Sequence, residues 1–343
     1  MTAVTVDPMI RHHDGLPVMR AARTGPTAAG FLSILLWGTS IAVGRLAMGE
    51  AGLMRGALFM ALGSGVVGSI LLLASRAERA KLRTLPRLYW WVCGGLFVLY
   101  TVAYNLGIGL ARDGRHVLVF GMLNYLWPVL TVAFSALIFH RRARFWLVPG
   151  LLMACVGIFL AFVSRPDASF TLGGILSDFM ATPGIYLLGM ACGISWALFS
   201  NLGKRIAGAN TANPVPLFFL ASGLVFLALF LAEVFPSAVP GAGAHRMSGA
   251  GIAALAYRAL IVDLLAYVLW DAAMRRGDQL LVAAASFCTP LLSTACISLL
   301  LGVRPGVVFW AACILLAAGA ALSHAGMRGE AAGPADRPPA DAR

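Results

Sequence analysis

Long apolar runs with few charged residues recur along the whole of this 343-residue sequence. A run of about 18 or more such residues is typical of a segment that crosses a lipid bilayer. Inside hydrocarbon the backbone must satisfy its own N–H and C=O groups, in helices or in a closed barrel. The runs lack the strict alternation of barrel strands. We therefore expect an all-α polytopic membrane protein.

Composition supports this expectation, because 60% of the residues are hydrophobic and only 12% are charged. A soluble domain needs more polar residues than this to face water. The net charge of +12 would also be compatible with binding to nucleic acid. However, the basic residues lie in short clusters between apolar runs and not along one face of a domain. We therefore expect the lipid bilayer as a partner, and no nucleic acid.

Ten transmembrane helices are predicted, five in each half of the chain. They cover residues 27–48, 55–75, 88–111, 116–139, 145–163, 184–203, 213–235, 249–274, 279–302 and 305–325. The corresponding domains are an N-terminal tail (1–26), a first five-helix repeat (27–163), a loop (164–183), a second five-helix repeat (184–325) and a disordered tail (326–343). A monomer is expected.

The distribution of lysine and arginine predicts the orientation. If the N-terminus lies in the cytoplasm, eighteen of the 26 basic residues fall on the inner side and seven on the outer side, with one inside a span. Cytoplasmic loops carry an excess of Lys and Arg. We therefore expect a multi-pass protein of the bacterial inner membrane with both termini cytoplasmic and the 164–183 loop in the periplasm.

Landmarks repeat between the two halves. The segment LLWGTSIAVGRL aligns with ISWALFSNLGKR through Trp37 and Trp196, and NYLWPVL aligns with SFCTPLL through Pro128 and Pro290. Arginines follow both prolines at 14 residues and glycines follow both at 29 residues. Since five is odd, the second half enters the membrane from the opposite side. This predicts an inverted repeat, with a substrate site near mid-membrane between the halves.

Each half has a proline within its fourth helix. Pro128 removes the helical partner of the Asn124 carbonyl, and Pro290 does the same to Ser286. A free carbonyl in hydrocarbon is tolerated where protein, a side chain or water satisfies it. The matched positions favour a pair of hinges that line a cavity. A kink needed only for packing is the alternative, because proline is common in membrane helices.

Aromatic and amide side chains lie deep in several spans. Tyr100 and Tyr104 are four residues apart and share a helix face. A cavity lined by such groups suits flat or aromatic solutes, whereas ordinary packing is the alternative. The candidate substrate-binding residues are Trp37, Tyr100, Tyr104, Asn124, Tyr125, Trp127, Trp196, Tyr267, Trp270 and Phe287.

Ionisable residues inside spans are costly and are functional candidates by default. Asp263 lies near the middle of the eighth span and could couple protons or bind a substrate ammonium, or it could form an ion pair within the bundle. His116 begins the fourth span. It is either a histidine at the water-exposed outer rim or part of a proton relay. Arg258 is expected nearer the outer face, where its side chain can reach water.

The sequence has no HExxH, CxxC, Walker or GxSxG motif, and GSGVVG (63–68) lies inside a span, where small residues let helices approach closely. No catalytic residue, metal or cofactor is therefore expected, and a membrane-embedded enzyme is the more remote alternative.

The two five-helix halves, with a tryptophan near the start of each and a proline in the fourth helix of each, resemble the drug/metabolite transporter superfamily. More narrowly, GMLNYLWPVLT, SFCTPLLSTA, AYVLWDAAMRRGDQ and VPGLLMACVGI resemble YddG-type aromatic amino acid exporters, which are EamA-like. The resemblance covers about 27–325. It implies an exporter of aromatic and other neutral amino acids, and of methyl viologen, with Tyr100 and the NYLWP residues at a central cavity. Tyr104 and Asp263 match no family motif, so their roles rest on chemistry alone.

The hypothesis is an efflux carrier that works by alternating access. Another substrate class, such as lipophilic cations or a different metabolite, remains open within the same superfamily. The sequence also leaves open whether protons drive the export.

Overall fold

The computed structural model describes residues 15–139, 145–163, 177, 179–208, 210–232, 247–277, 282 and 285–325, and these contain helices and no β-strand. The first half contains α1 (Gly15–Ala51), α2 (Leu53–Ala74), α3 (Arg76–Arg83), α4 (Arg87–Leu110), α5 (Gly114–Asn124), α6 (Trp127–Ile138) and α7 (Leu147–Val163). The second half contains α9 (Pro183–Ala207), α10 (Val215–Leu231), α11 (Gly249–Ala256), the π-helix η1 (Tyr257–Leu265), α12 (Ala266–Arg276), the 3-10 helix η2 (Ser286–Cys288), α14 (Thr289–Leu301) and α15 (Val307–Ala325).

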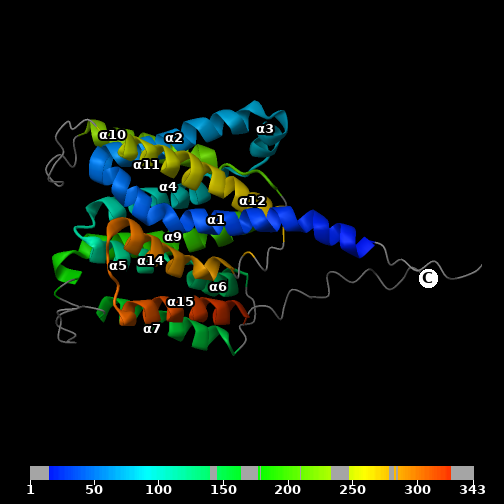
Figure 1. The fold of residues 1–343 in the computed structure, drawn as a ribbon. Helices are drawn as coiled ribbons and strands as arrows, with labels where there is room; N and C mark the ends of the chain where they lie inside the picture. Colours follow the sequence, from blue (N-terminus) through cyan, green and yellow to red (C-terminus); the bar gives the residue numbers. More distant parts are fainter. Residues whose placement is uncertain are drawn as a thin grey trace, which may run out of the picture.

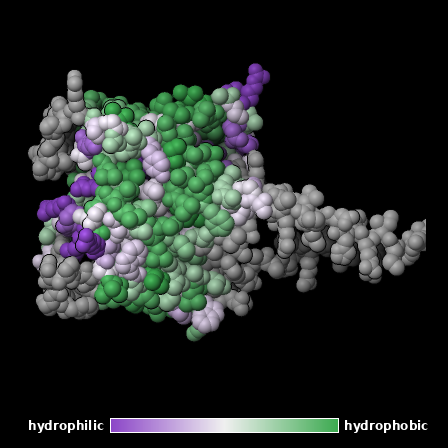
Figure 2. All heavy atoms as spheres, in the orientation of Figure 1, coloured by the Kyte–Doolittle hydropathy of each residue, from purple (hydrophilic) through white to green (hydrophobic). Residues whose placement is uncertain are grey.

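The outer surface of the helices is apolar, as expected for a protein that lies in a membrane (Figure 2). Six of the described helical segments are long and apolar enough to cross a bilayer: 24–51, 53–74, 87–110, 114–138, 183–207 and 249–273. On the face shown in Figure 2, apolar residues form a band across the helices, and hydrophilic residues gather towards the helix ends. Soluble proteins rarely expose such large apolar patches. The expectation of an all-helical polytopic membrane protein is confirmed.

The helices pack in a few extensive pairs. In Figure 1, α2 and α10 lie together at one edge of the molecule, and α7 and α15 lie together at the other. Between these edges, α4 packs along α9, and α1 packs along both α12 and α14. This arrangement places α1, α4, α9 and the η1–α12 segment around the centre, where their inward side chains meet.

The fourth and ninth spans, which contain Pro128 and Pro290, are both interrupted. The helix α5 ends at Asn124 and α6 begins at Trp127, so that Pro128 occupies the first turn of the second piece. The same occurs where η2 gives way to α14, with Pro290 in its first turn. Proline is tolerated in a first helical turn, because the N–H that it lacks has no helical partner there. The Ser286 carbonyl, whose helical partner Pro290 removes, accepts a hydrogen bond from the Thr289 hydroxyl at 2.6 Å, so a side chain satisfies it.

Two elements differ from the sequence expectation. Residues 76–83 lie in a segment predicted as a loop but form the short helix α3, in which the Ser75 hydroxyl caps the Glu78 N–H and Lys81 pairs with Glu78 at 2.6 Å. The eighth span is also not a uniform α-helix, because its middle is the π-helix η1. A π-helix is rare and is often found at functional sites.

Candidate functional site

A cavity lies at the centre of the bundle. Its walls come from α1, α4, α9, α10, η1 and α12, and from the two interrupted helices. The lining residues are Trp37, Ser40, Tyr100, Thr101, Tyr104, Asn105, Asn124, Tyr125, Trp127, Trp196, Phe219, Arg258, Val262, Asp263, Tyr267 and Thr289. The free volume is about 40 Å³, which leaves room for a few waters.

The structure brings most of the candidate substrate-binding residues to this one place. Eight of the ten line the cavity: Trp37, Tyr100, Tyr104, Asn124, Tyr125, Trp127, Trp196 and Tyr267. The other two do not. Trp270 packs behind Trp37, with ring centroids 5.0 Å apart, and Phe287 is buried in the hydrophobic core. Neither belongs to the lining. Both were included as candidates because helix spacing and repeat alignment do not say which way a ring points.

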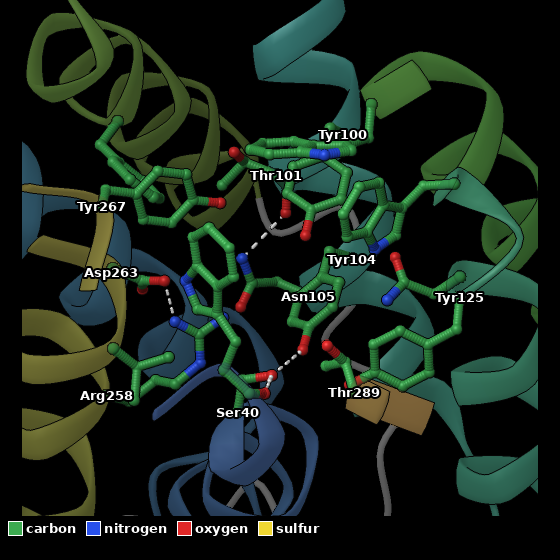
Figure 3. Close-up of a pocket in the computed structure, with 16 residues that line it drawn as sticks. Ser40, Tyr100, Thr101, Tyr104, Asn105, Tyr125, Arg258, Asp263, Tyr267 and Thr289 are labelled. Carbon is green, nitrogen blue, oxygen red and sulfur yellow. Dashed lines mark hydrogen bonds and ion pairs between the residues drawn. The ribbon is translucent and has the colours of Figure 1, made fainter. Parts of the chain in front are cut away.

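Aromatic rings, among them Tyr100 and Tyr267 in Figure 3, form much of the cavity wall, and several of them surround Trp196. Its ring centroid lies 4.9 Å from that of Tyr100, 5.8 Å from Tyr267 and 6.2 Å from Trp127. These separations fall in the range where aromatic rings attract one another. The rings come from α4, α6, α9 and α12, so the cluster joins helices of both halves of the chain.

Polar groups face the aromatic wall. The hydroxyls of Ser40 and Tyr104 lie 2.7 Å apart and connect α1 to α4. The Asn105 amide donates to the Thr101 carbonyl at 2.8 Å, as Figure 3 shows. Four buried atoms of lining residues have no hydrogen-bond partner among the described residues: Asn124 Oδ1, Trp37 Nε1, Thr101 Oγ1 and Arg258 Nε. Buried polar atoms normally have partners, so these are candidate contacts for a solute.

The cavity also holds a buried ion pair. Arg258 and Asp263 are 5% and 6% exposed, both line the cavity, and the guanidinium donates to Asp263 through Nη1. The guanidinium also lies over the Tyr104 ring, 5.4 Å from its centroid. The expectation that Arg258 reaches water near the outer face was wrong. The π-helix explains why Arg258 meets Asp263 instead of water. Its i→i+5 hydrogen bonds bring residues five apart close to one face, whereas an α-helix separates them.

The remaining candidates lie at other places. His116 is buried at the start of α5, outside the cavity lining, with Nδ1 2.8 Å from Asp113 Oδ1. Asp113 also accepts from the His116 backbone N–H at 2.8 Å and so caps the helix. The histidine therefore belongs to a helix cap, and the described residues place no cavity group beside it. Pro128 and Pro290 lie in the first turns of α6 and α14, beside the cavity residues Trp127 and Thr289.

Sequence reasoning did not include several lining residues among the candidates. Ser40, Thr101 and Asn105 are polar residues in apolar spans, and each is within four residues of a candidate aromatic side chain. That pattern was a usable signal. Phe219 and Val262 gave no such signal, because apolar residues in a span are expected everywhere.

Comparison with known proteins identifies the family to which the chain belongs. Residues 183–324 match the EamA-like transporter family. Three curated relatives, each named aromatic amino acid exporter YddG, are similar over most of their length. The protein of Ancylobacter novellus is 30% identical over 307 residues, 88% of this chain and 98% of the relative. Those of Salmonella typhimurium and Escherichia coli are 29% and 27% identical, over 86% and 88% of this chain and 95% and 97% of the relatives.

A solved crystal structure has the same fold. It is 28% identical in sequence, with a TM-score of 0.59, and the match covers 89% of this chain and 98% of that chain. Together with the six apolar spans, these similarities describe a multi-pass membrane transport protein and not an enzyme. The chain belongs to the YddG family of EamA-like transporters.

Proposed function

We propose that the protein exports aromatic and other neutral amino acids across the bacterial inner membrane by alternating access. The observation that carries the proposal is the cavity. Its lining combines the rings of Trp196, Tyr100 and Tyr267, from both halves of the chain, with buried polar atoms that have no hydrogen-bond partner in the described part of the chain. Flat, polarisable walls suit an aromatic side chain, and a few placed polar groups suit an amino acid backbone. The names of the curated relatives agree with this substrate class.

The architecture proposed for this activity is ten spans in two inverted five-helix halves, 27–163 and 184–325. Four shorter apolar helices, at 147–160, 215–231, 286–301 and 307–323, would complete the six longer ones. Reciprocal packing supports the repeat. The helix α1 packs on α12 and α14, while α9, its counterpart, packs on α4 and on α5 and α6.

Glycine contacts support the same relation between the halves. In α2 and α10, Gly65 lies against the backbone at Leu220, and Gly223 lies against the backbone at Leu62. In α7 and α15, Gly157 lies against Ala312, and Gly319 lies against Ala154. Each helix thus presents the same kind of residue to the other, as a two-fold relation requires. The repeat would place the cavity on the axis between the halves.

The orientation is proposed from charge. In Figure 1 the first turns of α1 and the last turns of α15 lie at the same end of the molecule, together with α3. The segment 76–87 carries five of the basic residues, which include Arg76 and Arg87. We place this end in the cytoplasm, because cytoplasmic loops are rich in Lys and Arg.

Transport requires the cavity to change size. A free volume of about 40 Å³ is well below the roughly 300 Å³ or more of typical ligand pockets, so an aromatic amino acid can enter only if the lining helices separate. The interruptions at Pro128 and Pro290 are places where the fourth and ninth spans can bend. Bending there would move Trp127 and Thr289, which line the cavity, relative to the rest.

Export of lipophilic cations is less well supported. A cation carrier needs a carboxylate that is free to receive the charge, whereas Asp263 is paired with Arg258. A cation entering beside this pair would meet a guanidinium of the same sign, which disfavours it.

Counterflow in proteoliposomes tests the proposal. Vesicles preloaded with unlabelled phenylalanine should take up labelled phenylalanine or tryptophan in a protein-dependent, saturable manner. Trp127→Ala should reduce the uptake, while Trp91→Ala is the matched control, because Trp91 is 82% exposed on α4 and does not line the cavity. The absence of protein-dependent uptake of both amino acids would reject the proposal.

A further inference from the structure

The ion pair in the cavity wall is a second element of recognition beside the rings. Arg258 and Asp263 both lie on η1, both face the cavity in Figure 3, and both are almost fully buried. We propose that this pair receives the backbone of a zwitterionic α-amino acid. The pair opens, Arg258 takes the substrate's carboxylate, and Asp263 takes its ammonium. This inference rests on the proposed function and specifies the substrates as amino acids with both backbone charges.

Charge balance is the first argument. Removing one partner of a buried ion pair is costly because it leaves an uncompensated charge in a low dielectric. A zwitterion carries one charge of each sign, so it can replace each partner of the pair and leave every charge matched. A solute with only an ammonium or only a carboxylate leaves Arg258 or Asp263 without its counterion. The pair therefore discriminates against both kinds of singly charged analogue.

The donor geometry of Arg258 is the second argument. A guanidinium has five N–H donors, and it binds carboxylates through two parallel hydrogen bonds. The Nε of Arg258 is buried and has no hydrogen-bond partner among the described residues. The side chain is held in place over the Tyr104 ring, 5.4 Å from its centroid. It therefore has donor capacity to spare for a carboxylate at a fixed position beside the cavity.

The relation of the pair to the rings is the third argument. Tyr267 follows Asp263 by four residues on the same continuous helix, and both line the cavity. Its ring lies 5.1 Å from that of Trp37 and 5.8 Å from that of Trp196, measured between centroids. A substrate whose backbone lies at the ion pair would thus place its side chain among these rings. Asn124 Oδ1, which has no hydrogen-bond partner among the described residues, can accept a further ammonium hydrogen in the same cavity.

The test compares three solutes that share an indole ring: tryptophan, tryptamine and indole-3-propionate. Each competes for counterflow of labelled tryptophan into vesicles with the wild-type protein. Tryptamine and indole-3-propionate should compete at least tenfold less well than tryptophan, which is roughly the loss of one hydrogen bond to a charged group. If either analogue competes as well as tryptophan, the inference is overturned. This comparison needs no variant.

The double variant Arg258→Met/Asp263→Leu then assigns the discrimination to the pair. Apolar residues of similar volume often replace a buried ion pair without loss of stability, so the variant should elute and melt like the wild type. Its binding of tryptophan, measured by calorimetry in detergent, should fall to the level of the two analogues. Glu78→Gln is the control, because it breaks the half-buried Glu78–Lys81 pair on α3, and neither residue lines the cavity. A folded double variant that still prefers tryptophan would refute the role of the pair.

The outcomes separate the two proposals. If the wild type shows no counterflow of either labelled tryptophan or labelled phenylalanine, the proposed function fails, and this inference fails with it. If the wild type moves tryptophan but does not discriminate against the analogues, the proposed function stands and only this inference fails.

Discussion

Substitution of Gly65 by alanine tests the packing of α2 against α10, which supports the proposed two-fold arrangement of the halves. A Cβ built on Gly65 would lie 2.5 Å from the Cα of Leu220 and 2.8 Å from the carbonyl carbon of Phe219. Both atoms belong to the backbone of α10, so no side-chain rotation can relieve the overlap. The helices must move apart instead. Gly95 on α4 is the matched control, because its Cβ would meet nothing within 4 Å.

The expected magnitudes follow from two opposing effects. Replacement of glycine by alanine inside a helix favours the helix by about 1 kcal/mol in free energy, and this gain applies at both positions. Overpacking costs about 1–3 kcal/mol, and this cost applies only at Gly65. We therefore expect Gly95→Ala to be neutral or slightly stabilising. We expect Gly65→Ala to be less stable than Gly95→Ala by about 1–3 kcal/mol.

The assay heats both detergent-solubilised variants at one rate and measures the folded fraction by size-exclusion chromatography, because membrane protein unfolding is often irreversible and depends on the heating rate. The apparent Tm of Gly65→Ala should be lower than that of Gly95→Ala. Gly223→Ala should behave like Gly65→Ala, since its Cβ would lie 2.9 Å from the Leu62 backbone nitrogen. Equal melting temperatures for Gly65→Ala and Gly95→Ala would refute the close approach of α2 and α10.

Three further predictions concern other contacts. Trp196→Ala should weaken tryptophan binding by about two- to twelvefold, because an aromatic contact contributes about 0.5–1.5 kcal/mol. Trp196→Phe should weaken it less, and calorimetry distinguishes the two. Ser40→Ala and Tyr104→Phe should each lower the free energy of unfolding by about 1 kcal/mol. Their double variant should lower it by about as much as either alone, because both substitutions remove the same 2.7 Å contact. Additive effects in thermal melts would contradict this prediction. Asp113→Ala should lower stability by about 1 kcal/mol through loss of the helix cap at His116, and Asp113→Asn, which still caps, should restore most of the Tm.

Much of the fold could be predicted because hydrocarbon imposes simple rules. Apolar runs had to become helices, and six of the predicted spans coincide with described helical segments long and apolar enough to cross a bilayer. Pro128 and Pro290 were expected to weaken the fourth and ninth spans, and α5–α6 and η2–α14 are interrupted there. The helix α3 was missed because short charged helices between spans carry no apolar signal. Their support is local, in the Ser75 cap and the Glu78–Lys81 pair.

The cavity was only partly predictable. Spacing by four indicated that Tyr100 and Tyr104 share a face, and both line the cavity. Nothing in the sequence said which faces point inward, and for this reason Trp270 and Phe287 were included as candidates. The pairing of Arg258 with Asp263 depends on a π-helix. On an ideal α-helix residues five apart point in different directions, so helical spacing argued against the contact.

The position of the tryptophans gives the protein its own optical reporter. Three of the eight tryptophans, Trp37, Trp127 and Trp196, line the cavity. Phenylalanine absorbs no light at the red edge of indole excitation, so its arrival among these indoles would change the emission spectrum without contributing to it. Conformational turnover could therefore be followed in unlabelled protein, in real time and in either detergent or lipid.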